Sequence, residues 1–273
     1  MRIALFQMTT GIDPAVNSAA LCAAVAEAAR GGATMLFTPE ISGLLDSNRE
    51  RARDQIHAED EDPVLADVCA AARAAGIWVH LGSLALDAGS RWTNRGFVID
   101  NEGHIRAHYD KIHLFDVDLP TGESWRESNA YAPGEGSVVV PTPAGQLGLS
   151  ICYDVRFPAL FQALSQAGAQ ILSVPAAFTV PTGEAHWHVL LRARAIENAC
   201  WVVAAAQCGT HEDGRKTFGH SLVIDPWGTI ILDMETQNGL GYAEIDLGKV
   251  ADVRNRVPVI AHRRPIPAVE VAQ

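Results

Sequence analysis

Hydrophobic and polar residues alternate along the first eighty positions in blocks that predict strands and helices in turn. Uninterrupted apolar runs predict buried strands at Ile3 to Gln7, Met35 to Phe37 and Ile77 to Leu81. Two stretches between these runs have a helical pattern; they begin at Asp13-Pro14 and Asp62-Pro63 and end at Gly31-Gly32 and Gly76. Aspartate followed by proline is typical of a helix start, and glycine is typical of a helix end.

The remaining pattern combines hairpins with further helices. Turn residues separate paired apolar runs, which predicts hairpins through Asn101-Glu102-Gly103, Pro143-Ala144-Gly145 and Asp225-Pro226-Trp227-Gly228. Helices are expected at Phe157 to Ala167 and Ala185 to Asn198, and strands at Leu147 to Ile151, Ile171 to Val174, Trp201 to Ala206 and Tyr242 to Ile245. This order predicts an α/β protein in which helices cover mixed sheets.

We expect one domain over residues 1–273, because no long linker or low-complexity tract interrupts the pattern. In such folds ligand sites lie at the carboxyl ends of strands. Residues 112–136 have the weakest pattern and are expected to form a long loop that lines a site. The tail, residues 258–273, contains three prolines and is expected to wrap the surface or a partner subunit.

Composition narrows the class of ligand. The chain is 48% hydrophobic and 19% charged, as is typical of a soluble globular protein, and its formal net charge is −11. A nucleic-acid or anionic membrane surface needs a basic face, so neither partner is expected. The net charge does not exclude a small anionic substrate, because one or two arginines suffice to bind it. No apolar stretch is long enough to span a bilayer.

The five cysteines are an odd number without CxxC spacing, so we expect no disulfide framework and a reducing, cytoplasmic location. Four of them (Cys22, Cys69, Cys200 and Cys208) are interpreted as small buried hydrophobic residues. Cys152 differs, because it stands between an apolar run and a helical pattern that follows Pro158. A cysteine at such a turn is placed like a nucleophile, and the next helix would favour its thiolate.

Two charged residues have a comparable setting at a strand end. Glu40 follows a buried strand and Pro39, where burial would raise its pKa and suit it to proton transfer; a surface or N-cap position is the alternative. Lys111 precedes the apolar run that starts at Ile112, and its charge could stabilise an oxyanion or lower a thiol pKa. Glu127, in the long loop, indicates nothing by itself.

Other cysteine or metal chemistries have weaker support. A papain-like site would need a histidine base, and none of the ten histidines has a recognisable partner motif. His186 and His188 are two apart on an expected helix, so they point to opposite sides and cannot easily share a metal. The chain has no glycine-rich phosphate-binding pattern. No metal site is therefore expected.

Three segments taken together resemble the Glu–Lys–Cys signature of the nitrilase superfamily of carbon–nitrogen hydrolases: Pro39-Glu40, Lys111-Ile112-His113, and Gly148 to Pro158. The resemblance extends from Ala4-Leu5-Phe6-Gln7 to His262-Arg263-Arg264-Pro265. Further segments resemble the Nit branch of that superfamily; they are His113 to Asp118, Thr182 to Trp187, Leu190 to Glu197, Val202 to Gly209, Gly219-His220-Ser221 and Asp225 to Thr229.

The resemblance implies a four-layer α-β-β-α sandwich that forms a homodimer or larger homo-oligomer by extending its layers. It also implies that Cys152 attacks an amide carbonyl and that Glu40 transfers protons. Lys111 and the backbone N–H of Tyr153 would hold the oxyanion, and Glu127 would position the lysine. The intermediate would be a thioester, and no cofactor would be needed.

The implied substrate is a small amide of a carboxylic acid, hydrolysed at its ω-amide bond. Deaminated glutathione is the expected substrate; α-ketoglutaramate, N-carbamoyl amides and nitriles are alternatives. From another class, the chain could be a silent binding protein on this fold, although the intact Glu40, Lys111 and Cys152 argue against it. A thiol redox protein would need a resolving cysteine near Cys152, and the sequence offers none.

The resemblance also places Arg156, His186, Trp187 and His188 near the substrate. Relatives commonly carry glutamate where this chain has His188, so a pocket-facing His188 would change the recognition of acidic groups and the pH dependence. Arg156 would either bind a substrate carboxylate with two hydrogen bonds or brace the turn through Asp154 or another acid. We favour bracing.

Overall fold

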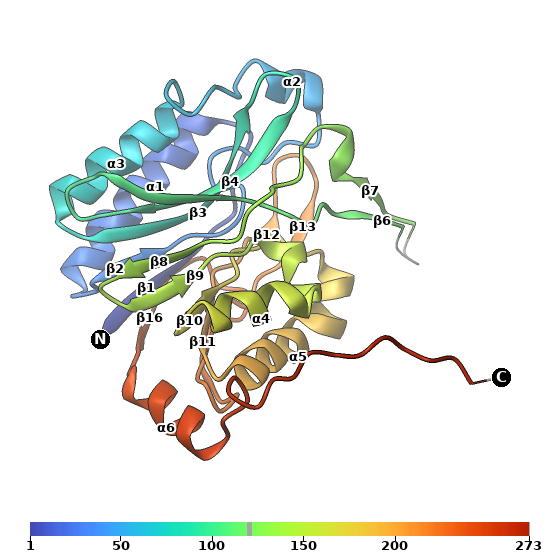
Figure 1. Cartoon of the computed structure of the whole chain (residues 1–273). Helices are drawn as coiled ribbons and strands as arrows, with labels where there is room; N and C mark the ends of the chain where they lie inside the picture. The colour runs from blue at the N-terminus through green and yellow to red at the C-terminus, as the bar shows by residue number, and fades with distance from the viewer. Residues whose placement is uncertain (119–121, 273) are drawn as a thin grey trace.

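The computed structural model of the chain describes residues 1–118 and 122–272. Two six-stranded mixed sheets lie face to face (Figure 1). In sheet order, the first contains β16 (Gly239–Glu244), β1 (Arg2–Gln7), β2 (Met35–Phe37), β3 (Trp78–Asp87), β4 (Trp92–Ile99) and β5 (Ile105–Asp110). The second contains β15 (Ile230–Asp233), β14 (Leu222–Ile224), β11 (Trp201–Ala204), β10 (Ile171–Ser173), β9 (Gly145–Gly148) and β8 (Val139–Thr142).

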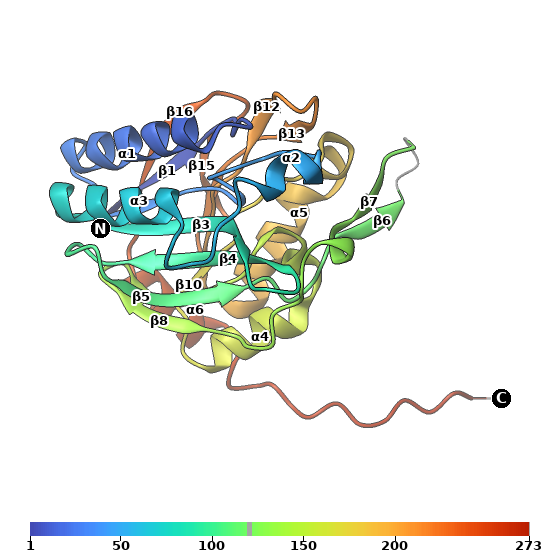
Figure 2. The same cartoon turned by 90° about the horizontal axis from the view of Figure 1, so that it is seen from above.

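Helices cover the outer face of each sheet. On the first sheet lie α1 (Pro14–Arg30) and α3 (Pro63–Ala75), and on the second lie α4 (Pro158–Gln166) and α5 (Val180–Asn198) (Figures 1 and 2). One hydrophobic cluster joins the first sheet to α1 and α3 through residues such as Leu21 and Val68. Another fills the space between the sheets, where Phe37 and Leu172 are fully buried. The expected α-β-β-α sandwich is therefore confirmed.

Three parallel strands form part of each sheet: β1, β2 and β3 in the first, and β9, β10 and β11 in the second. Strands that run in the same direction end at the same edge of a sheet, where side chains that follow them can meet. The segments that follow β2 and β9 carry Glu40 and Cys152, respectively. The topology thus brings together residues that are more than a hundred positions apart.

Some expected boundaries are wrong. Strand β9 ends at Gly148 instead of Ile151, so an irregular segment leads to Cys152. Helix α5 begins at Val180 instead of Ala185, because Pro181 lies in the first turn, where its missing N–H costs no hydrogen bond. The sequence did not predict four elements: α2 (Arg49–Arg53), α6 (Gly248–Arg256), β12 (Cys208–Thr210) and β13 (Lys216–Phe218).

Residues 112–136 were expected to form a loop, and they contain a short hairpin of β6 (Asp116–Asp118) and β7 (Ser124–Arg126), followed by the 3-10 turn η1 (Glu127–Asn129). Residues 119–121, which lie between these two strands in the sequence, are outside the described part of the chain.

The C-terminal segment is held to the body at Arg263, whose guanidinium donates to Asn198 Oδ1 at 2.7 Å and to the Gln162 carbonyl at 2.9 Å. Residues 264–272 are exposed and run away from the body (Figures 1 and 2). Packing of this segment on a partner subunit stays a prediction. Within the described ranges, no helix has both the length and the apolar character that crossing a membrane requires.

Candidate active site

Cys152 lies on a strained turn at the end of the second sheet. It begins a 3-10 turn, η2 (Cys152–Arg156), and its φ of 49° is in the left-handed region that residues with a side chain rarely adopt. Its backbone N–H donates to the Pro175 carbonyl at 2.8 Å. The next backbone N–H, that of Tyr153, donates no hydrogen bond to any described residue. The turn therefore presents a thiol and an unused N–H donor side by side.

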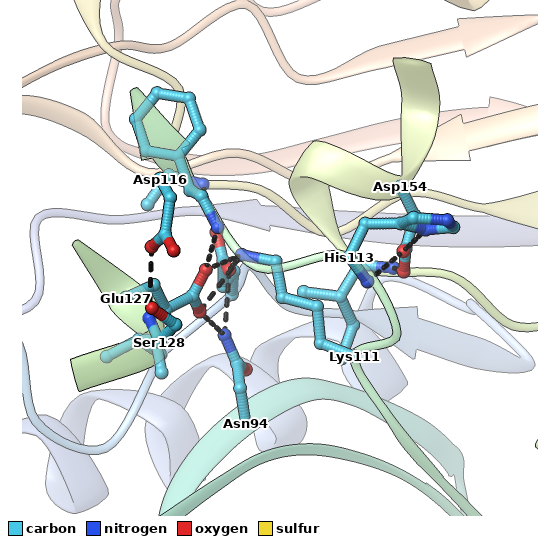
Figure 3. Close-up of polar contacts among 12 residues, drawn as sticks. Asn94, Lys111, His113, Asp116, Glu127, Ser128 and Asp154 are labelled. Carbon is cyan, nitrogen blue, oxygen red and sulfur yellow. Dashed lines mark hydrogen bonds and ion pairs between the residues drawn. The ribbon is translucent and has the colours of Figure 1, made fainter. Parts of the chain in front are cut away.

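A buried carboxylate fixes this turn. Asp154 Oδ2 accepts from the Ile151 N–H at 2.9 Å and from the Tyr109 hydroxyl at 2.7 Å. Its Oδ1 accepts from the His113 N–H at 3.0 Å and lies 2.7 Å from His113 Nδ1 (Figure 3). The His113 ring stacks on Phe157 with the ring centroids 3.5 Å apart. Tyr109 belongs to β5 and His113 to the segment after it, so Asp154 connects the cysteine turn to the first sheet.

Glu40 lies opposite the cysteine and is 4% exposed. Its Oε1 accepts from Lys111 Nζ at 2.8 Å and from Asn94 Nδ2 at 2.9 Å, and its Oε2 accepts from the Ala177 N–H at 2.9 Å. The backbone that carries Glu40 packs directly against β3 at Gly82, where a Cβ would lie 2.2 Å from the Thr38 carbonyl oxygen. Only glycine permits this approach.

Lys111 and Glu127 complete a buried cluster with Glu40 and Asn94. Lys111 Nζ lies 2.9 Å from Glu127 Oε2, and Asn94 Nδ2 donates to Glu127 Oε1 at 3.1 Å (Figure 3). The Phe115 N–H donates to Glu127 Oε2 at 2.6 Å. The side chains of Lys111, Glu40 and Glu127 are 3%, 5% and 13% exposed, so the ammonium group lies between two carboxylates and almost out of water.

The charges of the cluster differ from the sequence-based expectation. Burial favours a neutral Glu40, but Lys111 outweighs it and holds the pKa of that carboxyl below its ordinary value, so the expected rise is wrong. Burial and the Glu40 charge raise the pKa of the Cys152 thiol well above its ordinary value, although Lys111 opposes them. Burial would lower the pKa of Lys111, but Glu127 and Glu40 raise it well above the usual range.

The expectation that the next helix would hold Cys152 as a thiolate is therefore also wrong. Helix α4 begins only at Pro158, after the 3-10 turn and six residues beyond Cys152. The Cys152 thiol and the Glu40 carboxylate line the same cavity, and the charge of that carboxylate acts with burial to raise the thiol pKa. The resting site thus combines a protonated thiol, a carboxylate that can accept its proton, and a permanently charged lysine.

The directions of the pKa shifts of Glu40, Cys152 and Lys111 predict how kcat/KM depends on pH. Proton transfer from Cys152 requires ionised Glu40, so kcat/KM should rise as pH increases through the pKa of Glu40, which lies below 4.5. It should then stay level to beyond pH 9.0, because the pKa values of Cys152 and Lys111 are both raised. Initial rates between about pH 4 and pH 10 would test this expectation. A rising limb centred near neutral pH would contradict it, once circular dichroism has shown that the protein is folded throughout.

The cluster opens into a cavity of about 470 Å³, a size typical of sites for small molecules. Residues of the 112–136 segment line it, as expected for that segment. The sequence did not single out several other lining residues, which are Leu44, Asp46, Arg49, Trp92, Asn94, Phe178, Thr179 and Arg215. None of these carried a local signal; Asn94, for example, stands in the polar run Thr93-Asn94-Arg95.

The expected substrate-binding residues lie at different places. Arg156 and His186 contact one another, with His186 Nδ1 3.3 Å from both terminal nitrogens of the guanidinium. Neither is among the described residues that line the cavity. Arg156 forms no ion pair with Asp154 or another described acid, so the expected bracing through an acid is wrong. Its guanidinium lies over the ring of Phe178, with 5.4 Å between the guanidinium carbon and the ring centroid.

Trp187 and His188 also lie outside the cavity lining. Trp187 is fully buried, packs against Phe178 and donates through Nε1 to the His220 carbonyl at 2.8 Å. His188 Nε2 lies 2.9 Å from Asp233 Oδ2, and His220 Nδ1 lies 2.9 Å from the other oxygen of Asp233. His188 therefore belongs to a polar cluster between α5 and the end of β15 and not to the cavity wall.

Comparison with known proteins agrees with this geometry. Residues 2–255 match the carbon-nitrogen hydrolase family. The deaminated glutathione amidase of Bos taurus is 42% identical over 270 residues, which cover 96% of this chain and 82% of that protein. The chain belongs to the carbon-nitrogen hydrolase family of the nitrilase superfamily, and it is a hydrolase that acts on carbon–nitrogen bonds.

Solved structures extend the similarity to three dimensions. The NitFhit protein of C. elegans is 40% identical with a TM-score of 0.89; the match covers 96% of this chain and 65% of that one. A Glu-to-Gln mutant of the amidase from Nesterenkonia sp. AN1 is 30% identical with a TM-score of 0.80, over 94% of this chain and 98% of that one. In that mutant, acrylamide has added to the active-site cysteine.

Proposed function

We propose that the chain hydrolyses the amide of a small carboxylic acid through a thioester on Cys152. The observation that carries the proposal is the convergence of three groups on one cavity. These are a protonated thiol, a carboxylate in its ionised form and a buried ammonium, contributed by Cys152, Glu40 and Lys111. Each group supplies one requirement of acyl transfer: a nucleophile, a base and a charge for the oxyanion.

In the first half of the reaction, Glu40 accepts the Cys152 proton while the sulfur bonds to the amide carbon. The electron pair of the carbonyl moves to oxygen, where Lys111 and the Tyr153 N–H stabilise the negative charge. When this intermediate collapses, the carbon–nitrogen bond breaks and the nitrogen takes the proton from Glu40. The amine leaves, and the acyl group stays on sulfur as a thioester.

In the second half, Glu40 accepts a proton from water while the water oxygen attacks the thioester carbon. The same donors hold the second oxyanion, the carbon–sulfur bond breaks, and the proton returns from Glu40 to Cys152. The carboxylic acid leaves. Glu127 does not need to move a proton in either half, and we assign it the positioning of Lys111, which it contacts through both oxygens.

Deaminated glutathione is the substrate that we propose. Several relatives that are 40% to 42% identical over 96% of this chain carry the name deaminated glutathione amidase. That compound has a carboxylate at each end and an amide between them, and charged residues that include Arg49, Arg126 and Arg215 line the cavity. The main alternative, α-ketoglutaramate, keeps only the acyl-side carboxylate and releases ammonia.

Steady-state kinetics with both amides would test the substrate. We expect kcat/KM for deaminated glutathione to exceed that for α-ketoglutaramate by at least about 10-fold, because contacts to the larger leaving group contribute only with the first. An aliphatic amide such as propionamide serves as a control for the chemistry without acid recognition. Equal kcat/KM values for the two acids, or no turnover of either, would contradict the assignment.

We further propose that the chain forms a homodimer through the outer face of α5. Val189 and Ile196 on this helix are 69% and 49% exposed, and Trp227, in the adjacent turn, is 63% exposed. Such a large apolar patch is typical of a subunit interface. Analytical ultracentrifugation at several protein concentrations should give twice the chain mass of 29.2 kDa.

A cytoplasmic location also stays a proposal. It is supported by the free thiols of all five cysteines.

A further inference from the structure

Three buried polar atoms of the cavity wall have no hydrogen-bond partner. Among the described residues, these atoms are Asn94 Oδ1, Trp125 Nε1 and Arg215 Nε, and all three residues line the same cavity. Buried polar groups in folded proteins are nearly always paired, because an unpaired one costs free energy. These atoms mark one part of the cavity wall where the protein leaves polar groups without partners.

Two of these atoms are donors on neighbouring hairpins. Trp125 belongs to β7, and Arg215 lies in the turn between β12 and β13. The guanidinium carbon of Arg215 lies 4.6 Å from the centroid of the Trp125 ring, so the guanidinium lies over the indole. The indole N–H and the guanidinium Nε–H are buried. The two terminal nitrogens of Arg215 are not among the buried unpaired atoms, so they are the donors that a ligand in the cavity can reach.

Arg215 forms one ion pair but no side-chain hydrogen bond within the described residues. Its guanidinium donates no hydrogen bond to a described residue, and its nearest acid, Asp213, is 3.7 Å away, beyond hydrogen-bonding distance. The two Asp213 oxygens already accept from the backbone N–H groups of Ser47 and Arg215 at 2.8 and 2.9 Å. By contrast, Arg126, which also lines the cavity, donates to both oxygens of Asp118.

We propose that Arg215 and Trp125 form a subsite for a substrate carboxylate. The planar guanidinium matches a carboxylate with two parallel N–H donors, which its two terminal nitrogens can supply, and the Trp125 ring supports it from one face. A local cation matters here because the chain as a whole carries a formal charge of −11 and repels anions. The inference rests on the proposed hydrolysis of acidic amides and deepens it by assigning an acid-recognition residue.

The test compares Arg215→Gln with the wild type on acidic and neutral amides. On deaminated glutathione, we expect kcat/KM to fall about 10- to 100-fold, mainly through a higher KM, because a charge-assisted contact is lost. On propionamide, the change should stay below about twofold, because no carboxylate is present. Equal losses on both amides, or no loss on any acidic amide, would overturn the proposal.

Two further substrates identify which carboxylate binds. If it is the leaving-group carboxylate, deaminated glutathione with its glycine carboxyl converted to an amide should be insensitive to Arg215→Gln. If it is the acyl-side carboxylate, α-ketoglutaramate should lose as much activity as the parent compound. Lys216→Gln removes a charge from the same hairpin at an exposed position outside the cavity lining, and it should leave all rates unchanged.

A binding measurement separates the subsite from the proposed substrate. If the wild type hydrolyses propionamide but no acidic amide, the proposed function fails, and glutarate binding to Cys152→Ala by calorimetry then tests the subsite. Adding Arg215→Gln should weaken glutarate binding at least about 10-fold, and Trp125→Phe, which keeps an aromatic ring beside the guanidinium, should weaken it less. Unchanged binding, or no glutarate binding in any variant, would overturn the subsite.

Discussion

Replacing Cys152 with alanine is expected to lower kcat for amide hydrolysis by at least about 10⁴-fold, the loss that follows removal of a covalent nucleophile. No described side chain in the cavity offers another thiol, so neither Glu40 nor water can form the thioester in its place. The fold should persist, because only one buried sulfur atom is removed and alanine can replace Cys152 in the same backbone conformation. Release of the amine, measured by a coupled assay, gives kcat.

The matched control is Cys22→Ala, which removes a half-buried thiol on α1 away from the cavity. Its kcat should equal that of the wild type. Circular dichroism and thermal unfolding of both variants would show that the loss in Cys152→Ala is chemical. Amine release at more than about a tenth of the wild-type rate in Cys152→Ala would exclude the assigned nucleophile.

Replacing Lys111 with methionine is expected to remove both activity and stability. Methionine has a similar length but no charge, so two buried carboxylates, Glu40 and Glu127, would face each other without a cation. Breaking a buried ion pair in this way costs about 3–5 kcal/mol of unfolding free energy. Loss of the oxyanion donor should also lower kcat by about 10²- to 10³-fold. Urea unfolding and steady-state rates would measure the two effects.

A second substitution separates the two effects. Lys111→Met combined with Glu127→Gln removes one of the two carboxylate charges that Lys111→Met leaves unpaired. It should recover part of the stability but none of the activity. The control is Arg256→Met, which breaks the exposed pair with Asp252 at 3.0 Å and should cost less than about 1 kcal/mol. Wild-type kcat in the double variant would refute the assignment of Lys111 to the oxyanion.

Local signals in the sequence predicted an α/β protein in which helices cover mixed sheets, and the resemblance to the nitrilase superfamily added the order of the four layers. Proline and glycine marked the ends of α1 and α3, and apolar runs marked the central strands. The elements that it missed are short or weakly apolar: β12 and β13 contain three residues each, and α6 is largely polar. Their positions depend on tertiary contacts, which the order of residues does not reveal.

The site could be predicted in part for the same reason. Glu40, Lys111 and Cys152 follow strands, and the structure brings all three to one cavity. Their charges could not be predicted, because the sign of each pKa shift depends on which neighbour outweighs burial. Arg215 carried no signal at all, since its role depends on Trp125, which lies ninety positions earlier and on another hairpin.

The expectation for His188 was wrong for a related reason. Its neighbour in sequence, Trp187, faces the interior, and the helical rotation between them turns His188 toward Asp233. The resemblance had placed His188 among the substrate-binding residues. Its contacts instead connect α5 with β15, so it acts on the packing of the helix and not on the reacting atoms.

Intact-protein mass spectrometry under rapid acid quench tests the central claim most directly. During turnover of deaminated glutathione, the wild type should gain the mass of the acyl group, and peptide mapping should place it on Cys152. Neutral hydroxylamine should remove the adduct, as expected for a thioester. Cys152→Ala should gain no mass. Turnover at the full rate with no adduct under any quench time, or an adduct on another residue, would contradict hydrolysis through Cys152.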